Sequence, residues 1–178
     1  MIINWKGVFD MLVKNYAGGL VFWEDKVFLL KDERGEWIFP NGVIQKNELP
    51  AEAALRVVKG TAGITAEIVS TEGHASYEIS SKIRQNPIYN KIIWYVMISQ
   101  NDEYKIQQEK GYRNGGYYTI HEAMGLLTHN NKAILNFLSR RFFETVAEHN
   151  NENNSDDVNS NINNKVKIYR NMELWGFQ

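Results

Sequence analysis

The sequence predicts a mixed α/β domain, of the α+β kind, in which helices flank a β-sheet. Short runs of β-branched and aromatic residues alternate with turn residues through most of the chain, which is typical of strands. Two other segments carry apolar residues at helical spacing, one after Pro50 and one after Asn131. The length of 178 residues suits one main domain.

The N-terminal part of this pattern predicts a hairpin and a short third strand. Residues 18–23 and 26–31 are rich in Val, Leu and Phe, and Glu24-Asp25 lies between them. Such a pair of runs around a two-residue turn is typical of a β-hairpin. Residues 36–39 form a short apolar segment that stops at Pro40, so we expect a loop there.

The segment from Pro50 to Gly63 predicts a helix. Proline suits the first helical turn, because it needs no hydrogen-bond partner there, and glycine suits the C-cap. Between them, apolar residues at spacings of three and four predict one buried stripe, made of Ala51, Leu55, Val58 and Ala62.

The second half of the chain predicts more strands and then helices. We expect strands at 64–71, 74–79 and 89–99, the last so apolar that it should be a central strand buried on both faces. Residues 117–120 predict a short strand before a helix that starts near His121. A helix should then follow an Asn130-Asn131 cap, with its apolar face made of Ile134, Leu135, Phe137, Leu138, Phe142 and Val146.

Composition and charge exclude several classes of protein. The 20 basic and 21 acidic side chains give a net charge of −1, which does not favour global attraction to nucleic acid or anionic membranes. Without cysteine the chain forms no disulfide and no thiolate metal site. The longest apolar run, residues 92–98, is far shorter than the roughly 18 to 20 residues of a membrane span. The first residues do not resemble a secretory signal, so we expect a cytoplasmic protein with no membrane segment.

Composition also divides the chain into parts. We expect an N-terminal extension at 1–15, a domain at 16–148, a linker at 149–164 and an aromatic tail at 165–178. Of the fifteen residues 150–164, eight are Asn and three are acidic, which leaves too little apolar surface to order them. The apolar tail either packs on its own domain or on a second copy, as in a homodimer, or binds a protein partner.

One stretch of 23 residues, from Gly42 to Ile64, resembles a known motif. Its matching positions are Gly42, Glu48, Arg56, Val58, Gly63 and Ile64. This pattern resembles the Nudix box of the MutT-like pyrophosphohydrolases, and residues 91–96 are similar to a strand of the diadenosine-tetraphosphatase-type members. The resemblance covers about residues 16–146. It implies a Nudix-type α/β/α sandwich with a mixed β-sheet between helices.

The box is degenerate at the positions where the family holds its metal. The family's three box glutamates bind Mg²⁺ or Mn²⁺ against a substrate diphosphate, and Val57, Gly60 and Thr61 stand in their places here. On a helix, positions 60 and 61 each lie within about 60° of position 57, on a different face from the apolar stripe. A hard divalent cation needs several oxygen ligands, and this face offers one hydroxyl. We therefore expect no metal site, no bound cofactor and no catalytic residue on this face.

The retained polar residues have a structural interpretation. Glu48 and Arg56 are expected to form an ion pair that ties the loop to the helix. If the protein is an active hydrolase, the resemblance instead implies that Glu48, Arg56 and Glu109 take part in catalysis with Mg²⁺ or Mn²⁺.

A ligand is expected to contact a separate set of residues, namely Trp37, Asn41, Gly42, Lys91, Tyr112 and Arg113. The loop 110–118 combines cations, aromatic rings and glycines, which suits phosphate contact and base stacking. A solvated connector explains this composition equally well.

Three functions stay open at this stage. The first is a catalytically impaired Nudix-fold module that binds a nucleotide-like small molecule, RNA or a protein partner. The second is an active hydrolase of nucleoside diphosphate derivatives, such as dinucleoside polyphosphates or nucleoside triphosphates, with atypical metal ligands. The third is a structural or oligomerisation role that uses the tail.

Overall fold

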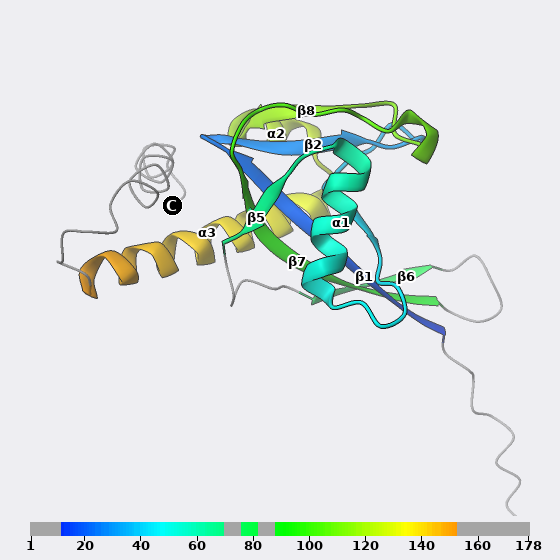
Figure 1. Ribbon diagram of the computed structural model, residues 1–178, viewed down its shortest axis with the longest axis horizontal. Helices are drawn as coiled ribbons and strands as arrows, with labels where there is room; N and C mark the ends of the chain where they lie inside the picture. Colours follow the sequence, from blue (N-terminus) through cyan, green and yellow to red (C-terminus); the bar gives the residue numbers. More distant parts are fainter. Residues whose placement is uncertain (1–11, 70–75, 82–87, 153–178) are drawn as a thin grey trace, which may run out of the picture.

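The computed structural model describes residues 12–69, 76–81 and 88–152, and Figure 1 shows their arrangement. The strands are β1 (Leu12–Trp23), β2 (Lys26–Lys31), β3 (Trp37–Ile38), β4 (Asn41–Val43), β5 (Ala66–Ile68), β6 (Ser76–Ser81), β7 (Ile88–Ser99) and β8 (Asn114–Thr119). The helices are α1 (Pro50–Ala62), α2 (Ile120–Leu126) and α3 (His129–Glu152), and a 3₁₀ turn spans Gln108–Lys110.

The predicted hairpin is confirmed as β1 and β2. The two strands pair antiparallel, with Phe22 opposite Val27, and Glu24 adopts a left-handed φ of 51° in the turn between them. A two-residue hairpin turn requires positive φ, because only that twist matches the twist of the strands. β1 is longer than predicted and begins at Leu12.

The strands form one mixed sheet in the order β3-β2-β1-β7-β5, with β4, β6 and β8 paired to β1, β7 and β2. β1 and β7 run parallel from Leu12 opposite Ile88 to Phe22 opposite Ile98. The other strand pairs are antiparallel. The predicted fold class, a mixed sheet between helices, is therefore confirmed.

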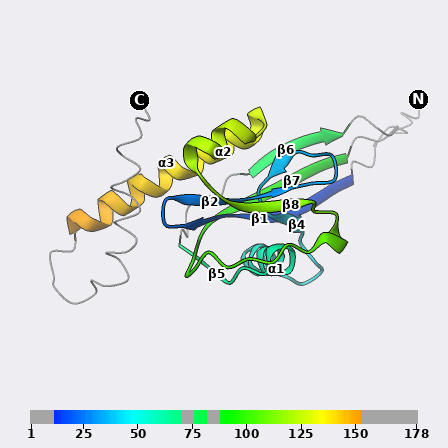
Figure 2. The ribbon, with the colours of Figure 1, turned by 90° about the horizontal axis from the view of Figure 1, so that it is seen from above.

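The helices cover opposite faces of this sheet, α1 on one side and α2 with α3 on the other (Figure 2). Two apolar clusters fill the two spaces. The α1-side core contains Ala17, Val21, Phe28, Leu30, Ala53, Ala54, Val58, Ala62, Ile64 and Met97. The α3-side core contains Leu20, Phe22, Val27, Leu29, Phe39, Ile92, Trp94, Val96, Ile120, Ala123, Leu127, Ile134, Leu135 and Leu138.

β7 contributes to both cores, as its apolar sequence predicts. Trp94 and Val96 are buried in the α3-side core, and Met97 is buried in the α1-side core. β7 also lies inside the sheet, because it pairs with β1 on one side and with β5 and β6 on the other.

α1 is confirmed at both ends, but its buried face is broader than predicted. Gly63 caps the helix with a left-handed φ of 70°, as its position in the sequence predicts. Ala51 and Leu55 of the predicted stripe are only half-buried. The buried residues are Ala53, Ala54, Val57, Val58, Thr61 and Ala62. The difference arises because α1 contacts β4 as well as β1, so a second side of the helix is covered.

The later elements are confirmed with shifted boundaries. Of the predicted strand 64–71, residues 64–69 are described, and β5 forms within them. The predicted strand 117–120 begins earlier, at Asn114, and ends before Ile120. β8 extends back through two glycines because each of its six residues pairs with β2. α3 begins at His129, just before the predicted Asn130-Asn131 cap.

The predicted division of the chain stays a prediction. β1 begins within the predicted extension 1–15, and α3 continues to Glu152, four residues into the predicted linker 149–164. The tail at 165–178 lies outside the described residues. Within the described part of the chain, no helix has the length and apolar character of a membrane span.

We expect Gly18→Ala to destabilise the fold by about 1–3 kcal/mol, the range for overpacked cores. A Cβ at Gly18 would lie 2.6 Å from Trp94 Cζ3 and 2.7 Å from the Pro40 carbonyl oxygen. Trp94 is buried, and the Pro40 carbonyl accepts a hydrogen bond from Gly19 N, so both groups are held in place. Urea denaturation followed by circular dichroism measures the change.

The matched control is Gly125→Ala, in the exposed part of α2, where a Cβ would meet nothing within 4 Å. This variant should be neutral or more stable by up to about 1 kcal/mol, because alanine is the better helix former. Equal midpoints for the Gly18 variant and the wild type would contradict the close packing described here.

Candidate functional site

Val57, Gly60 and Thr61 lie on α1, which begins after a loop and a proline. Leu49 N donates to Glu52 Oε2 (3.1 Å), and Pro50 begins the helix. These two features start α1 directly after the loop that follows β4, so the box helix lies against β4 and β1.

The face formed by Val57, Gly60 and Thr61 is closed by the chain itself. Val57 is 5% exposed and packs on Gly42, where an added Cβ would come within 2.8 Å of Val57 Cγ2. Thr61 is also 5% exposed, and its Oγ1 donates to the Val57 carbonyl oxygen (2.8 Å). The one hydroxyl of this face is therefore already committed to the helix backbone.

Residues 105–110, which we call the strap, run along the C-terminal end of α1. Lys105 N donates to the Ala62 carbonyl (2.7 Å) and Gln107 N to the Thr61 carbonyl (2.9 Å). Lys110 Nζ donates to the carbonyl oxygen of Gly60 (2.6 Å). The last carbonyls of a helix lack partners within it, and the strap supplies donors to them.

These residues do not fit a divalent cation on the box face. Val57 is apolar, Gly60 has no side chain, and an ammonium group already lies beside Gly60. A second cation there would be repelled by Lys110 and would find no carboxylate. Nor does any group of three or more His, Asp or Glu side chains in the described ranges lie close enough to hold a metal.

The expected ion pair between Glu48 and Arg56 is present. Arg56 Nε and Nη2 donate to the two carboxylate oxygens of Glu48, at 2.8 Å for Nη2, and Nη2 also donates to the Val43 carbonyl (3.0 Å). Gln45 N donates to the same carboxylate (2.8 Å). Glu48 and Arg56 thus connect the loop after β4 with the middle of α1.

This pairing changes the acidity of Glu48. The hydrogen bonds from Arg56, and then the one from Gln45 N, lower the pKa of Glu48 from 4.5 to about 2. A carboxyl with so low a pKa stays ionised in neutral solution and makes a poor proton acceptor. The geometry of Glu48 is that of a structural ion pair.

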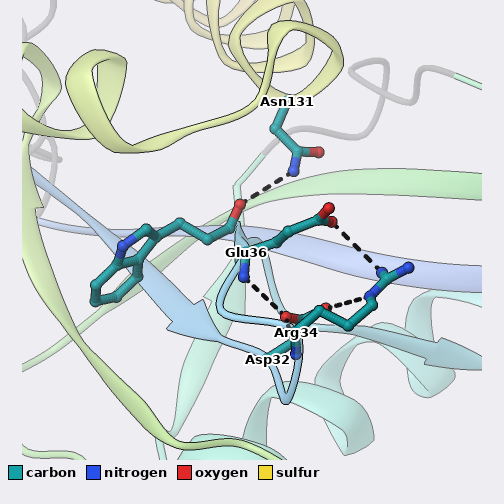
Figure 3. Close-up of polar contacts among 5 residues, drawn as sticks. Asp32, Arg34, Glu36 and Asn131 are labelled. Atoms are coloured by element: carbon teal, nitrogen blue, oxygen red, sulfur yellow. Dashed lines mark hydrogen bonds and ion pairs between the residues drawn. The ribbon is translucent and has the colours of Figure 1, made fainter.

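Two of the residues predicted to bind a ligand lie on the α3 side of the sheet. Trp37 packs against the α3-side core, and its ring meets that of Tyr118 edge-on at 5.1 Å. The Trp37 carbonyl accepts a hydrogen bond from Asn131 of α3 (3.3 Å; Figure 3). Asn41 is half-buried, and its Nδ2 donates to the Phe39 carbonyl (2.8 Å).

The next two predicted residues lie on β4 and β7. Gly42 is opposite Ala17 of β1, which belongs to the α1-side core, so Gly42 faces α1. Lys91 is exposed on β7, opposite Asn15 of β1. The alternation of strand residues therefore places Gly42 and Asn41 on opposite faces of the sheet.

The last two predicted residues, Tyr112 and Arg113, line a common pocket. This pocket has a volume of about 370 Å³, and its other lining residues are Glu33, Gln108 and Gly111. Tyr112 packs against the α1-side core, and burial, followed by the charge of Asp32, raises the pKa of its hydroxyl. Arg113 is exposed beside it and holds its place through Arg113 N, which donates to the Lys31 carbonyl (2.9 Å).

A rigid turn presents Glu33 to this pocket. The Asp32 carboxylate accepts hydrogen bonds from the backbone nitrogens of Arg34 and Glu36, both at 2.9 Å (Figure 3). Arg34 also bridges to Asp32 and Glu36 through its side chain. On the opposite wall, a Cβ on Gly111 would collide with the Glu33 carboxylate, so Gly111 permits this close approach.

The structure thus joins Tyr112 and Arg113 but separates them from Trp37 and Asn41. Glu109 is exposed in the 3₁₀ turn and forms no ion pair with the described residues. Sequence analysis missed the contact of Lys110 with Gly60. The only sequence signals for it were a lysine in a glycine-bearing loop and a glycine inside a predicted helix.

Comparisons with known proteins agree on one fold. The family model described as "NUDIX domain" matches residues 13–156. Among solved structures, an Ap4A hydrolase of C. elegans is 17% identical with a TM-score of 0.63 and covers 72% of this chain and 97% of its own.

Two further solved structures are similar to the same extent. The MutT protein of Methanosarcina mazei Go1 is 17% identical, with a TM-score of 0.58 and coverage of 74% of this chain and 96% of its own. The dihydroneopterin triphosphate pyrophosphohydrolase of E. coli is 17% identical, with a TM-score of 0.57 and coverage of 72% and 99%. At this identity the structural likeness shows the fold.

We expect Glu48→Gln to destabilise the protein at neutral pH and to have a smaller effect in acid. Because the folded pKa of Glu48 lies below its ordinary value, its contribution to stability is full above pH 4.5. The contribution is lost as the pH falls from 4.5 towards 2. Urea midpoints of the variant and the wild type at pH 7 and pH 3 measure this difference.

Glu67→Gln is the matched control, because Glu67 is exposed on β5 and forms no ion pair with the described residues. Its effect should be small at both pH values. A Glu48 variant whose destabilisation does not change between pH 7 and pH 3 would show that the ion pair adds nothing to stability.

Proposed function

Because the chain belongs to the Nudix family, we propose that it is a catalytically impaired member that binds a nucleotide-like ligand without Mg²⁺ or Mn²⁺. The observation that carries this proposal is the closed box face of α1. Val57 packs on Gly42, the Thr61 hydroxyl bonds to the helix backbone, and Lys110 lies beside Gly60.

The loss of metal ligands bears directly on rate. A metal stabilises the charge that develops on a transferred phosphoryl group and activates the attacking water, and each of these effects contributes several kcal/mol. Glu48 does not take over the activation of water from the metal, since Arg56 and Gln45 N already bind its carboxylate. Glu109 is a single exposed carboxylate.

The pocket at Tyr112 and Arg113 supports the binding part of the proposal. An arginine guanidinium forms charge-assisted hydrogen bonds with phosphate, and a tyrosine ring offers a surface for a base. Its volume of about 370 Å³ lies within the range of small-molecule sites. The proposal also includes RNA or a protein partner as the ligand.

An active hydrolase with atypical metal ligands is the alternative function, and the structural similarity to hydrolases favours it.

We expect the purified protein to release nucleotide or phosphate from dinucleoside polyphosphates, nucleotide sugars and nucleoside triphosphates at near background rates. A loss of several kcal/mol corresponds to a rate at least about a thousandfold below that of an intact Nudix hydrolase assayed beside it.

The same samples allow a check that does not depend on the choice of substrate. A metal that binds only the folded protein raises its melting temperature as the metal concentration rises. We expect no such rise with Mn²⁺. A concentration-dependent rise, or robust metal-dependent turnover, would favour the active hydrolase.

We expect nucleotide binding to be weak and equal with and without EDTA, as measured by calorimetry with ATP, a dinucleoside polyphosphate and a short RNA. Arg113→Gln should weaken binding about tenfold, the value of roughly 1.4 kcal/mol. Lys91→Gln should change it little, because Lys91 is not among the residues that line the pocket. A strict Mg²⁺ requirement, or a larger loss with the Lys91 variant, would contradict this site.

A further inference from the structure

We propose that the Lys110 ammonium group binds a phosphate group of the ligand at the box face of α1, in the place of a divalent cation. This inference rests on the proposed function and names the positively charged group that would bind the ligand. It begins from the disagreement between the metal that the fold family implies and the residues that are present on that face.

The position of Lys110 depends on Gly60. Lys110 Nζ lies 2.6 Å from the Gly60 carbonyl oxygen, and a Cβ on Gly60 would be only 3.1 Å from the same nitrogen. Glycine costs a helix about 1 kcal/mol relative to alanine, and its place in the last turn of α1 is explained by this approach. The close approach at Gly60 is thus made by a cation of the same chain.

The backbone around Lys110 is held before any ligand arrives. Lys105 N and Gln107 N bond to the end of α1, and Lys110 N bonds to the Gln107 carbonyl (3.0 Å). The negative end of the α1 dipole also attracts the ammonium group. A cation held in this way loses less conformational freedom on binding than a free surface lysine.

The charge of Lys110 is not neutralised by a carboxylate. The described residues contain three ion pairs, and none includes Lys110 or the neighbouring Glu109. An ammonium group has three donors, of which the Gly60 carbonyl takes one, so two are left for a ligand. The side chain is exposed, so an anion has access to it.

A phosphate group fits this chemistry better than a carboxylate ligand or a metal. A phosphate carries more negative charge than a carboxylate and has several acceptor oxygens. By comparison, the C-terminal end of α1 carries only about half a negative charge. Arg113 follows three residues later, between the strap and β8, and lines the pocket, so this short stretch of the chain carries two cations. The phosphate belongs either to a free polyphosphate ion or to a nucleotide.

The test measures binding of inorganic pyrophosphate and of ADP by calorimetry in EDTA, with the full chain. Lys110→Gln should weaken pyrophosphate binding at least tenfold. Gly60→Ala, whose Cβ makes the ammonium group shift by a few tenths of an ångström, should weaken it at least threefold. Lys110→Arg should retain part of the affinity, because it keeps the charge. Circular dichroism melts of all variants check that each one folds.

Lys105→Gln is the matched control, since Lys105 is an exposed lysine of the strap whose backbone, not its side chain, bonds to α1. It should bind pyrophosphate within twofold of the wild type. An equal loss with the Lys105 variant would show diffuse attraction and overturn the proposal, as would undiminished binding by Lys110→Gln or no binding by the wild type.

The two ligands distinguish the sources of the phosphate. Equal affinities for pyrophosphate and ADP would assign the site to phosphate itself, and tighter ADP binding would assign it to a nucleotide. If Lys110→Gln changes neither while the wild type binds nucleotide in EDTA, this inference fails and the proposed function stands. Metal-dependent hydrolysis by the wild type would instead refute the proposed function. The effect of Lys110→Gln on pyrophosphate binding is measured separately, in EDTA, and tests this inference by itself.

Discussion

The parallel pairing of β1 with β7 is the interaction on which the rest of the arrangement depends. It runs from Leu12 opposite Ile88 to Phe22 opposite Ile98 and places the two strands through the middle of the sheet. Because side chains alternate along a strand, this register sends one set of residues towards α1 and the other towards α3. A shift by one residue would exchange the two cores, so the register also decides which face receives the box helix.

The end of α1 joins stability and chemistry in the same few atoms. Its last carbonyls need donors, and the strap supplies two backbone nitrogens and the Lys110 ammonium group. The contacts that complete the helix therefore also place a cation on the box face. Val57 closes the neighbouring part of that face by packing on Gly42.

Sequence reasoning predicted the local part of the site and missed the distant part. The Glu48 and Arg56 pair was predictable, because both residues lie within one loop and helix and their charges are opposite. Lys110 was not, because its bond to Gly60 joins residues 50 positions apart. Likewise the sequence predicts that both Trp37 and Tyr112 contact a ligand, and only the pairing of strands shows that they pack on different cores.

The sequence by itself determined the hairpin, the limits of α1 and the lack of a carboxylate at positions 57, 60 and 61. These features depend on residues close together in the chain: a turn between two apolar runs, Pro50 and Gly63 at the helix ends, and residue identity at fixed spacing. Only the tertiary structure decided that the box face is closed and that Lys110 lies on it. Those outcomes depend on strand register and on the path of the strap over α1, which bring together residues that no local pattern connects.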